Sequence, residues 1–284
     1  MIRARTLAAA AAALTLPLAA WAEGTSPWLP IPGQLSLSLG VSQQSAKAAY
    51  IGSTEVPINA ITGGGAQKYE RSSTTLRVGY GLTDALALDL SVGSGRVKVG
   101  AADNDSGTQD SLLGISWRAL DEFESPGLPT LTLRAGAIIK GSYEGQRLAA
   151  VGNDQNGFEV SALIGRQFTS DWSAWAELGV QNRSGAVPNA NFFELGTRLR
   201  VVSGLSVSLG YASKRYGGNL DIGGPGFSPA RFQEVKAERG VTKLGLAYAF
   251  AGNQAVALNL GKVSSGRNST KDDRISGLSY TIAF

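Results

Sequence analysis

The sequence predicts an all-β protein folded as a transmembrane antiparallel up-and-down β-barrel, with twelve strands as the best count within a range of ten to fourteen. Three observations lead to this fold class. Apolar and polar residues alternate in runs along nearly the whole chain, which is the period of a β-strand. The connections between runs are alternately short and long. The polar positions are rich in Gly, Ser, Thr and Ala, as in the interior of a closed barrel.

The alternating runs follow one another from residue 34 to Phe284. In each run one parity carries Leu, Val, Ile or an aromatic residue, and the other carries small or polar residues. The twelve runs cover residues 34–41, 74–82, 85–92, 110–117, 131–139, 158–165, 172–180, 193–201, 205–211, 243–250, 256–261 and 276–284.

The connections indicate how these strands are joined. Short connections are predicted at residues 81–84, 120–129, 169–171, 202–204 and 251–254. Longer, polar and Gly-rich connections are predicted at residues 46–70, 100–108, 141–155, 182–189, 215–235 and 264–272. An antiparallel meander with one trimmed end and one elaborated end produces this pattern. With an even number of strands, both termini lie at the trimmed end.

The positions of the aromatic residues separate a membrane barrel from a soluble β-sandwich. A sandwich would concentrate aromatic side chains in the middle of its strands. Here the apolar parity carries aromatic residues near both strand ends, as a bilayer with two interfaces selects. At the trimmed end these are Tyr80, Trp117, Phe168, Trp172, Phe250 and Phe284. At the opposite end they are Phe158, Phe193 and Tyr211.

The first 22 residues have the organisation of a secretory signal peptide. Arg3 and Arg5 precede an apolar run over residues 7–20, and Ala20-Trp21-Ala22 ends it with an A-x-A cleavage pattern. We expect cleavage after Ala22, so residues 1–22 are the signal peptide and residues 23–284 form the barrel. The alternative is an N-terminal membrane anchor, but the apolar run is short for a span.

Composition excludes several classes of function. The chain has no Cys and no His, which excludes a disulfide framework and catalytic mechanisms that need an imidazole side chain. Once Arg3 and Arg5 are removed, 24 basic residues face 22 acidic ones, too balanced for nucleic-acid binding. Residues 103–110 have the acid spacing of a calcium loop but lack its final Glu. We therefore expect no enzyme, no catalytic residue, no cofactor, no metal and no nucleic-acid partner.

The chain resembles bacterial outer-membrane β-barrel proteins over essentially its whole mature length. The resemblance rests on "SYTIAF" (residues 279–284) and on the hairpin "YGLTDALALDLSVG" (residues 80–93). It implies a Gram-negative outer membrane as the location, a bilayer with lipopolysaccharide as the surroundings, short periplasmic turns and longer extracellular loops. It also implies that the barrel-assembly machinery reads the last strand through Tyr280, Ile282 and Phe284.

Within that group, length, strand count and the opening "SPWLPIPGQLSLSLG" (residues 26–40) are similar to transporter-type barrels. These include the barrels labelled "meta-pathway of phenol degradation". The resemblance implies passage of small solutes, including small hydrophobic or aromatic compounds. The alternative is a non-transporting structural or adhesive barrel that acts through its extracellular loops. The oligomeric state stays open.

The polar parity supplies the candidate lumen-lining residues. The principal ones are Arg77, Asp89, Arg134, Glu159, Trp175, Glu177, Glu194, Arg198, Arg200 and Lys243; Asp110, Lys140, Arg183 and Lys214 have the same parity. The basic excess, eight to five, indicates a pore wall that attracts anions, or else a packed interior of mutually paired charges. Trp175 has two possible roles. It is either a platform on which a solute stacks or a residue that packs the interior of the barrel, and packing is the favoured interpretation. The loop over residues 216–232 either caps the barrel or lies exposed, and the apolar loop over residues 48–65 is a second candidate cover.

Overall fold

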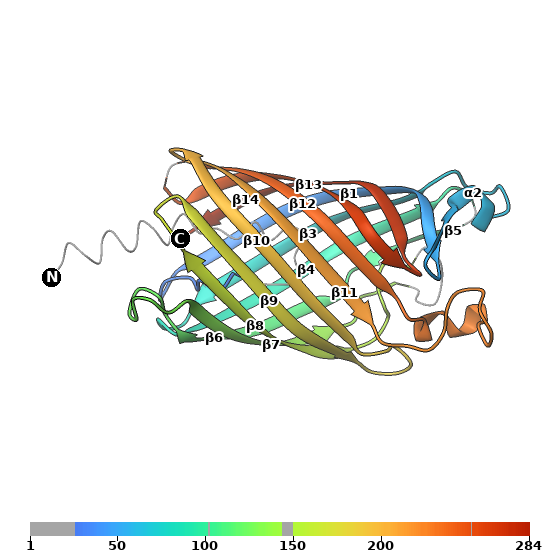
Figure 1. The fold of residues 1–284 in the computed structure, drawn as a ribbon, viewed down its shortest axis with the longest axis horizontal. Helices are drawn as coiled ribbons and strands as arrows, with labels where there is room; N and C mark the ends of the chain where they lie inside the picture. The colour runs from blue at the N-terminus through green and yellow to red at the C-terminus, as the bar shows by residue number, and fades with distance from the viewer. Residues whose placement is uncertain (1–25, 102, 144–149, 251) are drawn as a thin grey trace.

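The computed structural model describes residues 26–101, 103–143, 150–250 and 252–284, so the predicted signal peptide lies outside the described residues. Twelve long antiparallel strands form one closed ring (Figure 1). They are β1 (Leu35–Ile51), β3 (Tyr69–Gly81), β4 (Leu86–Val99), β6 (Ser111–Leu120), β7 (Thr130–Ile139), β8 (Gly157–Gln167), β9 (Trp172–Arg183), β10 (Ala190–Val202), β11 (Leu205–Tyr216), β12 (Glu238–Phe250), β13 (Gln254–Arg267) and β14 (Thr270–Ala283).

The ring closes where the last strand pairs with the first. β14 runs antiparallel to β1, with Ser36 opposite Ala283 at one end and Ala49 opposite Thr270 at the other. Beyond the strand, the Phe284 amide donates to the Leu35 carbonyl at 2.8 Å. Closure leaves the ring without an unpaired edge, which a hydrocarbon environment requires. The predicted up-and-down barrel of twelve strands is confirmed.

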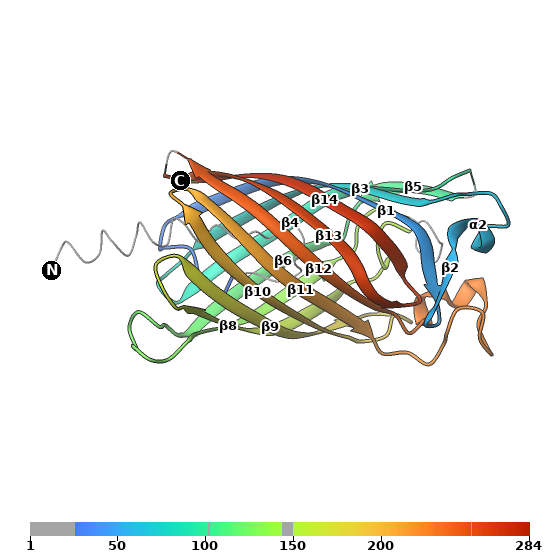
Figure 2. The ribbon, with the colours of Figure 1, turned by 45° about the horizontal axis from the view of Figure 1, so that its top comes forward.

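The two ends of the barrel differ. The short turns lie at the end where the chain terminates, which we call the short-turn end (left in Figures 1 and 2). The opposite, long-loop end carries β2 (Thr54–Pro57), β5 (Asp103–Thr108), the single-turn helix α2 (Ile58–Ile61) and the 3-10 helix η1 (Pro229–Glu234). Among the described residues, no helix is long and apolar enough to cross a membrane.

The outer face is apolar, as the alternation predicts. Leu178 is 67% exposed, whereas the adjacent Glu177 is 2% exposed and faces the lumen. The predicted aromatic groups also meet on the outer face. At the short-turn end Phe168 stacks on Trp172, with 4.4 Å between the ring centroids. Near the long-loop end the ring centroids of Phe193 and Tyr211 are 5.6 Å apart.

The predicted boundaries of the long connections are wrong. The connections are shorter than predicted, because the strands continue beyond the alternating runs. Residues 264–272 were expected as a loop, but only Asn268 and Ser269 separate β13 from β14, and Asn268 adopts the left-handed conformation that such a turn needs (φ 47°). β1 likewise runs on to Ile51. Above the bilayer neither strand face meets hydrocarbon, so the backbone pairing persists while the apolar alternation that marks a strand is lost.

Candidate functional site

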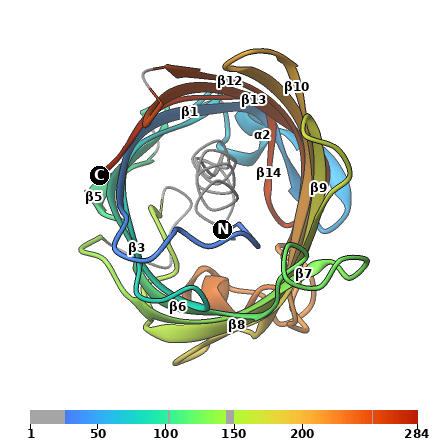
Figure 3. The ribbon, with the colours of Figure 1, turned by 90° about the vertical axis from the view of Figure 1, so that its left-hand side faces the viewer.

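The segment over residues 26–34, which we call the N-terminal segment, crosses the opening of the barrel at the short-turn end (Figure 3). The Thr132 hydroxyl on β7 donates to the Pro27 carbonyl at 2.7 Å. Pro27 also fills the space above Gly165 on β8, where an added Cβ would lie 2.4 Å from the proline ring. At its other end the segment is tied to β3, since the Gly33 amide donates to the Gly81 carbonyl at 2.8 Å.

Sequence analysis did not anticipate this crossing. The available signal was the prolines at positions 27, 30 and 32, which cannot donate to a sheet ladder and so keep this segment out of the first strand. Nothing in the local pattern indicates that the segment turns inward. The residues that it contacts on β7 and β8 lie more than 100 positions away in sequence.

The middle of the lumen holds a network of charged side chains, which we call the charge belt. Its centre is Arg134 on β7, which is 3% exposed. Arg134 pairs with Glu159 on β8 at 2.5 Å and with Asp89 on β4 at 2.7 Å. The Gln181 amide donates to the second Glu159 oxygen at 3.1 Å. Gly114 makes room for the network, because a Cβ there would lie 2.4 Å from the Asp89 carboxylate.

The charge belt continues across the lumen. Lys243 on β12 pairs with Glu194 on β10 at 2.9 Å, and Glu194 lies opposite Glu177 in the β9–β10 ladder. Arg77 on β3 interacts electrostatically with both Asp89 and Glu194, although β10 is on the far side of the ring. The belt thus has three basic and four acidic residues: Arg77, Arg134, Lys243, Asp89, Glu159, Glu177 and Glu194. The basic excess of the predicted lumen residues lies outside the belt.

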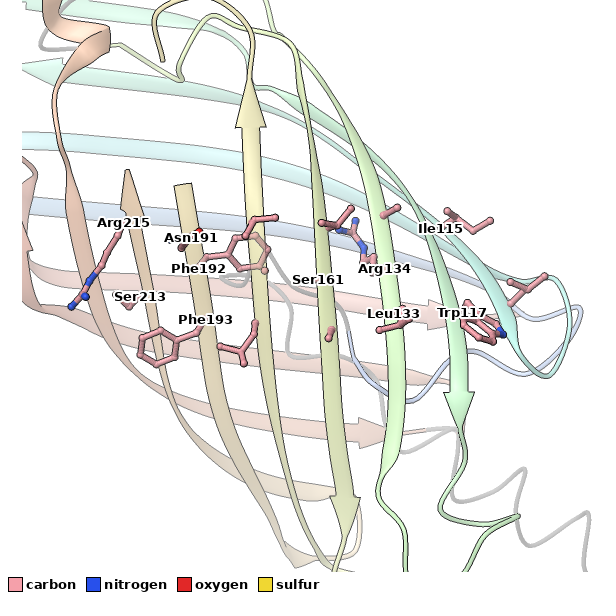
Figure 4. A pocket seen from close by; sticks show the side chains of 17 residues that line it. Ile115, Trp117, Leu133, Arg134, Ser161, Asn191, Phe192, Phe193, Ser213 and Arg215 are labelled. Atoms are coloured by element: carbon pink, nitrogen blue, oxygen red, sulfur yellow. The ribbon is translucent and has the colours of Figure 1, made fainter. Parts of the chain in front are cut away.

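Two aromatic rings pack over glycines on the lumen side of β9 and β10. Trp175 lies opposite Gly196, where an added Cβ would be 2.2 Å from the indole. Phe192 lies opposite Gly179 in the same way, at 2.2 Å. Figure 4 shows Phe192 and its neighbour Phe193 leaving β10 toward opposite sides. The geometry favours packing as the role of Trp175, and Phe192 is a lumen residue that sequence analysis missed.

Arg198 and Arg200 do not join the charge belt. They lie nearer the short-turn end and line a separate cavity of about 60 Å³ with Gln167, Ser173 and Ser206. Arg200 donates to the Ser170 carbonyl at 2.9 Å. The cluster that stands out most clearly in the sequence is therefore a second site along the lumen.

A larger cavity of about 670 Å³ lies in the lumen, and one wall of it differs from the rest in its side chains. This wall, formed by β14, β1, β3 and β4, carries small hydroxyl side chains, namely Ser36, Ser38, Ser42, Ser73, Thr75, Ser91 and Thr281. We call it the hydroxyl wall. The cavity extends from Phe232 and Gln233 at the long-loop end to Ser36 and Thr281 near the short-turn end, and it passes the charge belt at Arg77.

The connection between β7 and β8 folds into the long-loop end of this cavity. Val151 is 1% exposed, and its carbonyl accepts a hydrogen bond from Arg71 on β3. Tyr143 and Arg183 both bond to Asp110, the latter at 2.5 Å. Burial and the hydrogen bond to Asp110 raise the pKa of Tyr143. These contacts hold Tyr143 and Val151 at the long-loop end of the cavity, which the polar sequence of this connection did not indicate.

The two loops considered as covers both pack onto the barrel mouth. Phe232, at the end of the 216–232 loop, lines the cavity and meets Phe227 at 6.3 Å. Ile58 from the first loop is fully buried in a cluster with Val97, Val99 and Val151. The apolar character of the first loop is thus explained by contacts with extensions of the barrel.

A concavity of about 960 Å³ lies against the outer face (Figure 4). Its exposed walls include Trp117, Leu133 and Leu178, which face the lipid. Among the described residues, no group of three or more Asp or Glu side chains is placed to hold a metal ion, and residues 103–108 form β5.

A closed antiparallel ring with an apolar outer face and a polar, charged lumen defines an outer-membrane β-barrel. No protein-family model and no curated protein sequence matches the chain. Solved structures of outer-membrane barrels share the fold, among them the following three. The COG4313 outer membrane channel from Pseudomonas putida F1 is 17% identical, with a TM-score of 0.71 over 93% of this chain and 100% of that one.

The KdgM porin is 10% identical, with a TM-score of 0.51 over 88% of this chain and 99% of that one. The translocator domain of the autotransporter NalP from Neisseria meningitidis is 14% identical, with a TM-score of 0.52 over 100% and 95%. These likenesses confirm the predicted fold and its resemblance to outer-membrane barrels. In such barrels the short turns face the periplasm and the long loops face outward, so the ends are named accordingly below.

Proposed function

We propose that this barrel passes small solutes across the outer membrane along the hydroxyl wall. The observation that carries the proposal is the cavity of about 670 Å³, which reaches from the extracellular loops to Ser36 and Thr281 near the periplasmic opening. A packed structural barrel of this size would fill its lumen with side chains. Here the side chains on β1 and β14 are too small to do so.

The charge belt is compatible with this path because its residues come from β3, β4, β7–β10 and β12, and none comes from β1 or β14. Five of the seven belt residues thus lie on strands outside the hydroxyl wall, while Arg77 and Asp89 lie on two of its strands and line the same cavity. Paired charges brace the lumen, and the hydroxyl wall beside them is left passable. Serine and threonine hydroxyls replace the hydration of a polar solute at low cost, since they donate and accept.

The extracellular part of the path also has apolar lining. Leu112, Ile138, Val151 and Phe232 face the cavity there. This mixture suits solutes with a small apolar or aromatic body and at least one polar group. The solved structures with TM-scores of 0.71 and 0.51 are described as a channel and a porin, which agrees with a transport function.

The proposal is tested with a matched pair of substitutions on one strand. Ser38 lines the cavity on β1, whereas the next residue, Leu39, is 53% exposed on the lipid face. Ser38→Trp should reduce conductance in planar bilayers and solute flux into liposomes, because the indole occupies the path. Leu39→Trp should leave both unchanged. A wild-type barrel that passes no tested solute would contradict transport and favour the structural or adhesive alternative.

We also propose how the chain reaches the membrane. Residues 1–22 act as a signal peptide cut after Ala22, and the barrel-assembly machinery reads Tyr280, Ile282 and Phe284 on the last strand. The support is the signal-like N-terminal pattern together with the outward position of Tyr280 and Phe284, which are 39% and 67% exposed. The mass of the protein extracted from outer membranes tests the cleavage, since retention of residues 1–22 would contradict it.

A further inference from the structure

The small periplasmic cavity beside β10 carries a net positive charge. Arg198 and Arg200 line it from β10, and the remaining lining residues are mostly hydroxyl, amide or alanine side chains. Asp171 is the one acidic residue among the described residues that line it. The cavity therefore carries two guanidinium groups against one carboxylate.

The two arginines are held very differently. Arg200 donates to the Ser170 carbonyl at 2.9 Å and lies 3.6 Å from the Asp171 carboxylate, a loose and partly exposed contact. Arg198 is half-buried and makes no hydrogen bond or ion pair with any residue that the structure describes. The nearest charge acting on Arg198 is that of Arg200, which repels it.

This arrangement contrasts with the charge belt. Arg134 is more deeply buried than Arg198, yet it is satisfied by two carboxylates. A cation removed from water without a partner is costly, and removal of a counter-ion from a buried pair is destabilising for the same reason. The Arg198 guanidinium is thus positioned for an anion that the described residues do not supply.

The geometry suits one small oxyanion. Two residues apart on a strand, Arg198 and Arg200 project from the same face at about 7 Å between Cα atoms. Guanidinium groups bind carboxylates with two parallel N–H donors, and the hydroxyls of Ser173 and Ser206 add further donors. A cavity of about 60 Å³ accommodates a carboxylate head group, while a larger body must remain in the main lumen.

We propose that Arg198 and Arg200 form an anion-binding site at the periplasmic end of the lumen, which takes the carboxylate of a small organic acid. The assignment of this acid as a transported solute rests on the proposed function, whereas the binding site itself does not. An acid that enters along the hydroxyl wall would meet Arg198 and Arg200 last. The site therefore favours anionic solutes over neutral ones of the same shape.

Binding is measured first, by calorimetric titration of the intact detergent-solubilised barrel at constant ionic strength. The probes are benzoate, its neutral analogue benzyl alcohol, and inorganic phosphate. Benzoate should bind saturably and more tightly than either of the others. Arg198→Gln should weaken benzoate binding by about tenfold or more, since a charged hydrogen-bonded contact is lost. Arg166→Gln is the matched control, because Arg166 is at the same end of the barrel but outside the cavity.

Equal benzoate binding by wild type and Arg198→Gln would overturn the site. Phosphate binding as tight as that of benzoate would overturn the assignment to organic acids. Should Arg198→Gln fail to insert, Arg198→Lys keeps the charge but loses the two-pronged donor, and it should also weaken benzoate binding.

Flux separates this proposal from the proposed function. In liposomes, Arg198→Gln should lower benzoate entry several-fold while benzyl alcohol entry stays as in the wild type. Parallel loss of both fluxes would contradict a carboxylate-specific role. If the wild type passes neither compound, the transport proposal fails, while the calorimetric result still decides whether the anion site exists.

Discussion

Trp28 donates a 2.8 Å hydrogen bond from its indole nitrogen to the carboxylate of Glu122, 94 positions away in the turn between β6 and β7. The other Glu122 oxygen accepts a hydrogen bond from the backbone amide of Gln167, at the end of β8, at 2.9 Å. Glu122 thus attaches the N-terminal segment to two strand ends of the periplasmic opening. This attachment holds the segment across the lumen.

Trp28→Phe should loosen the N-terminal segment, because the ring is kept but the indole donor is lost. We expect higher mean conductance and more frequent transitions in single-channel recordings. Trp172→Phe is the control, since it removes the indole donor to Thr197 on the outer face, at 2.9 Å. Identical recordings for Trp28→Phe and wild type would show that this hydrogen bond does not hold the segment.

Arg134→Met should destabilise the barrel by about 3–5 kcal/mol, because the buried Glu159 and the partly buried Asp89 would both lose the cation that they share. Urea unfolding in phospholipid vesicles, followed by tryptophan fluorescence, measures the loss. Arg166→Met is the control, as its only described contact is a hydrogen bond to the Gly127 carbonyl. A loss below about 1 kcal/mol would mean that Asp89 and Glu159 find other partners.

Gly196→Ala should destabilise the β9–β10 wall by about 1–3 kcal/mol, since the new methyl would lie 2.2 Å from the Trp175 ring. The double variant with Trp175→Leu should recover part of that loss, because the ring that causes the clash is gone. Gly40→Ala is a lumen-side control whose nearest neighbour would be 3.7 Å away. Additive effects of the Gly196 and Trp175 substitutions would contradict their direct contact.

Acid should release the extracellular loop between β11 and β12. Hydrogen bonds from Arg267 and then Asn268 lower the pKa of Asp221 below its usual value. The pKa of Asp221 is lower in the ordered loop than in the released loop, where it has its ordinary value of about 4. Ionised Asp221 therefore stabilises the ordered loop above about pH 4, and this stabilisation is lost as the pH falls through the lowered pKa.

This pH dependence can be followed with a fluorophore on Ala230→Cys, since the chain has no other cysteine. Anisotropy of the probe should fall on acidification of the wild type. With Asp221→Asn it should be low at neutral pH and vary little. A wild-type loop that stays ordered to pH 2 would rule out Asp221 as its clamp.

Phe284→Ala should slow membrane insertion more than it alters transport by the inserted fraction. The reason is the proposed recognition of the last strand by the assembly machinery. The appearance of the heat-modifiable folded band in membranes measures insertion. Phe250→Ala is the control. The ring centroid of Phe250 lies 6.4 Å from that of Tyr280, so Phe250 belongs to the same girdle of aromatic residues but lies outside the last strand. Normal insertion with lost transport would contradict the proposal.

Sequence alone was sufficient for the fold and for the facing of residues within the alternating runs. Leu178 outside and Glu177 inside follow from the two-residue period of a strand, whatever its neighbours are. The paired ends of β13 and β14 were not predictable in this way. Beyond the lipid, both faces of a strand meet water and the period disappears from the sequence.

The functional site depended on tertiary structure, because charge pairing across a barrel is set by strand register and ring closure. Arg134 meets Asp89 and Glu159 only because β4, β7 and β8 carry them to one level, and nothing in any single strand specifies that level. The same holds for Arg198, whose lack of a described partner could not be seen from the charges beside it in sequence. Local alternation determined which side chains enter the lumen, and long-range packing decided which charges are satisfied there and which segment crosses the exit.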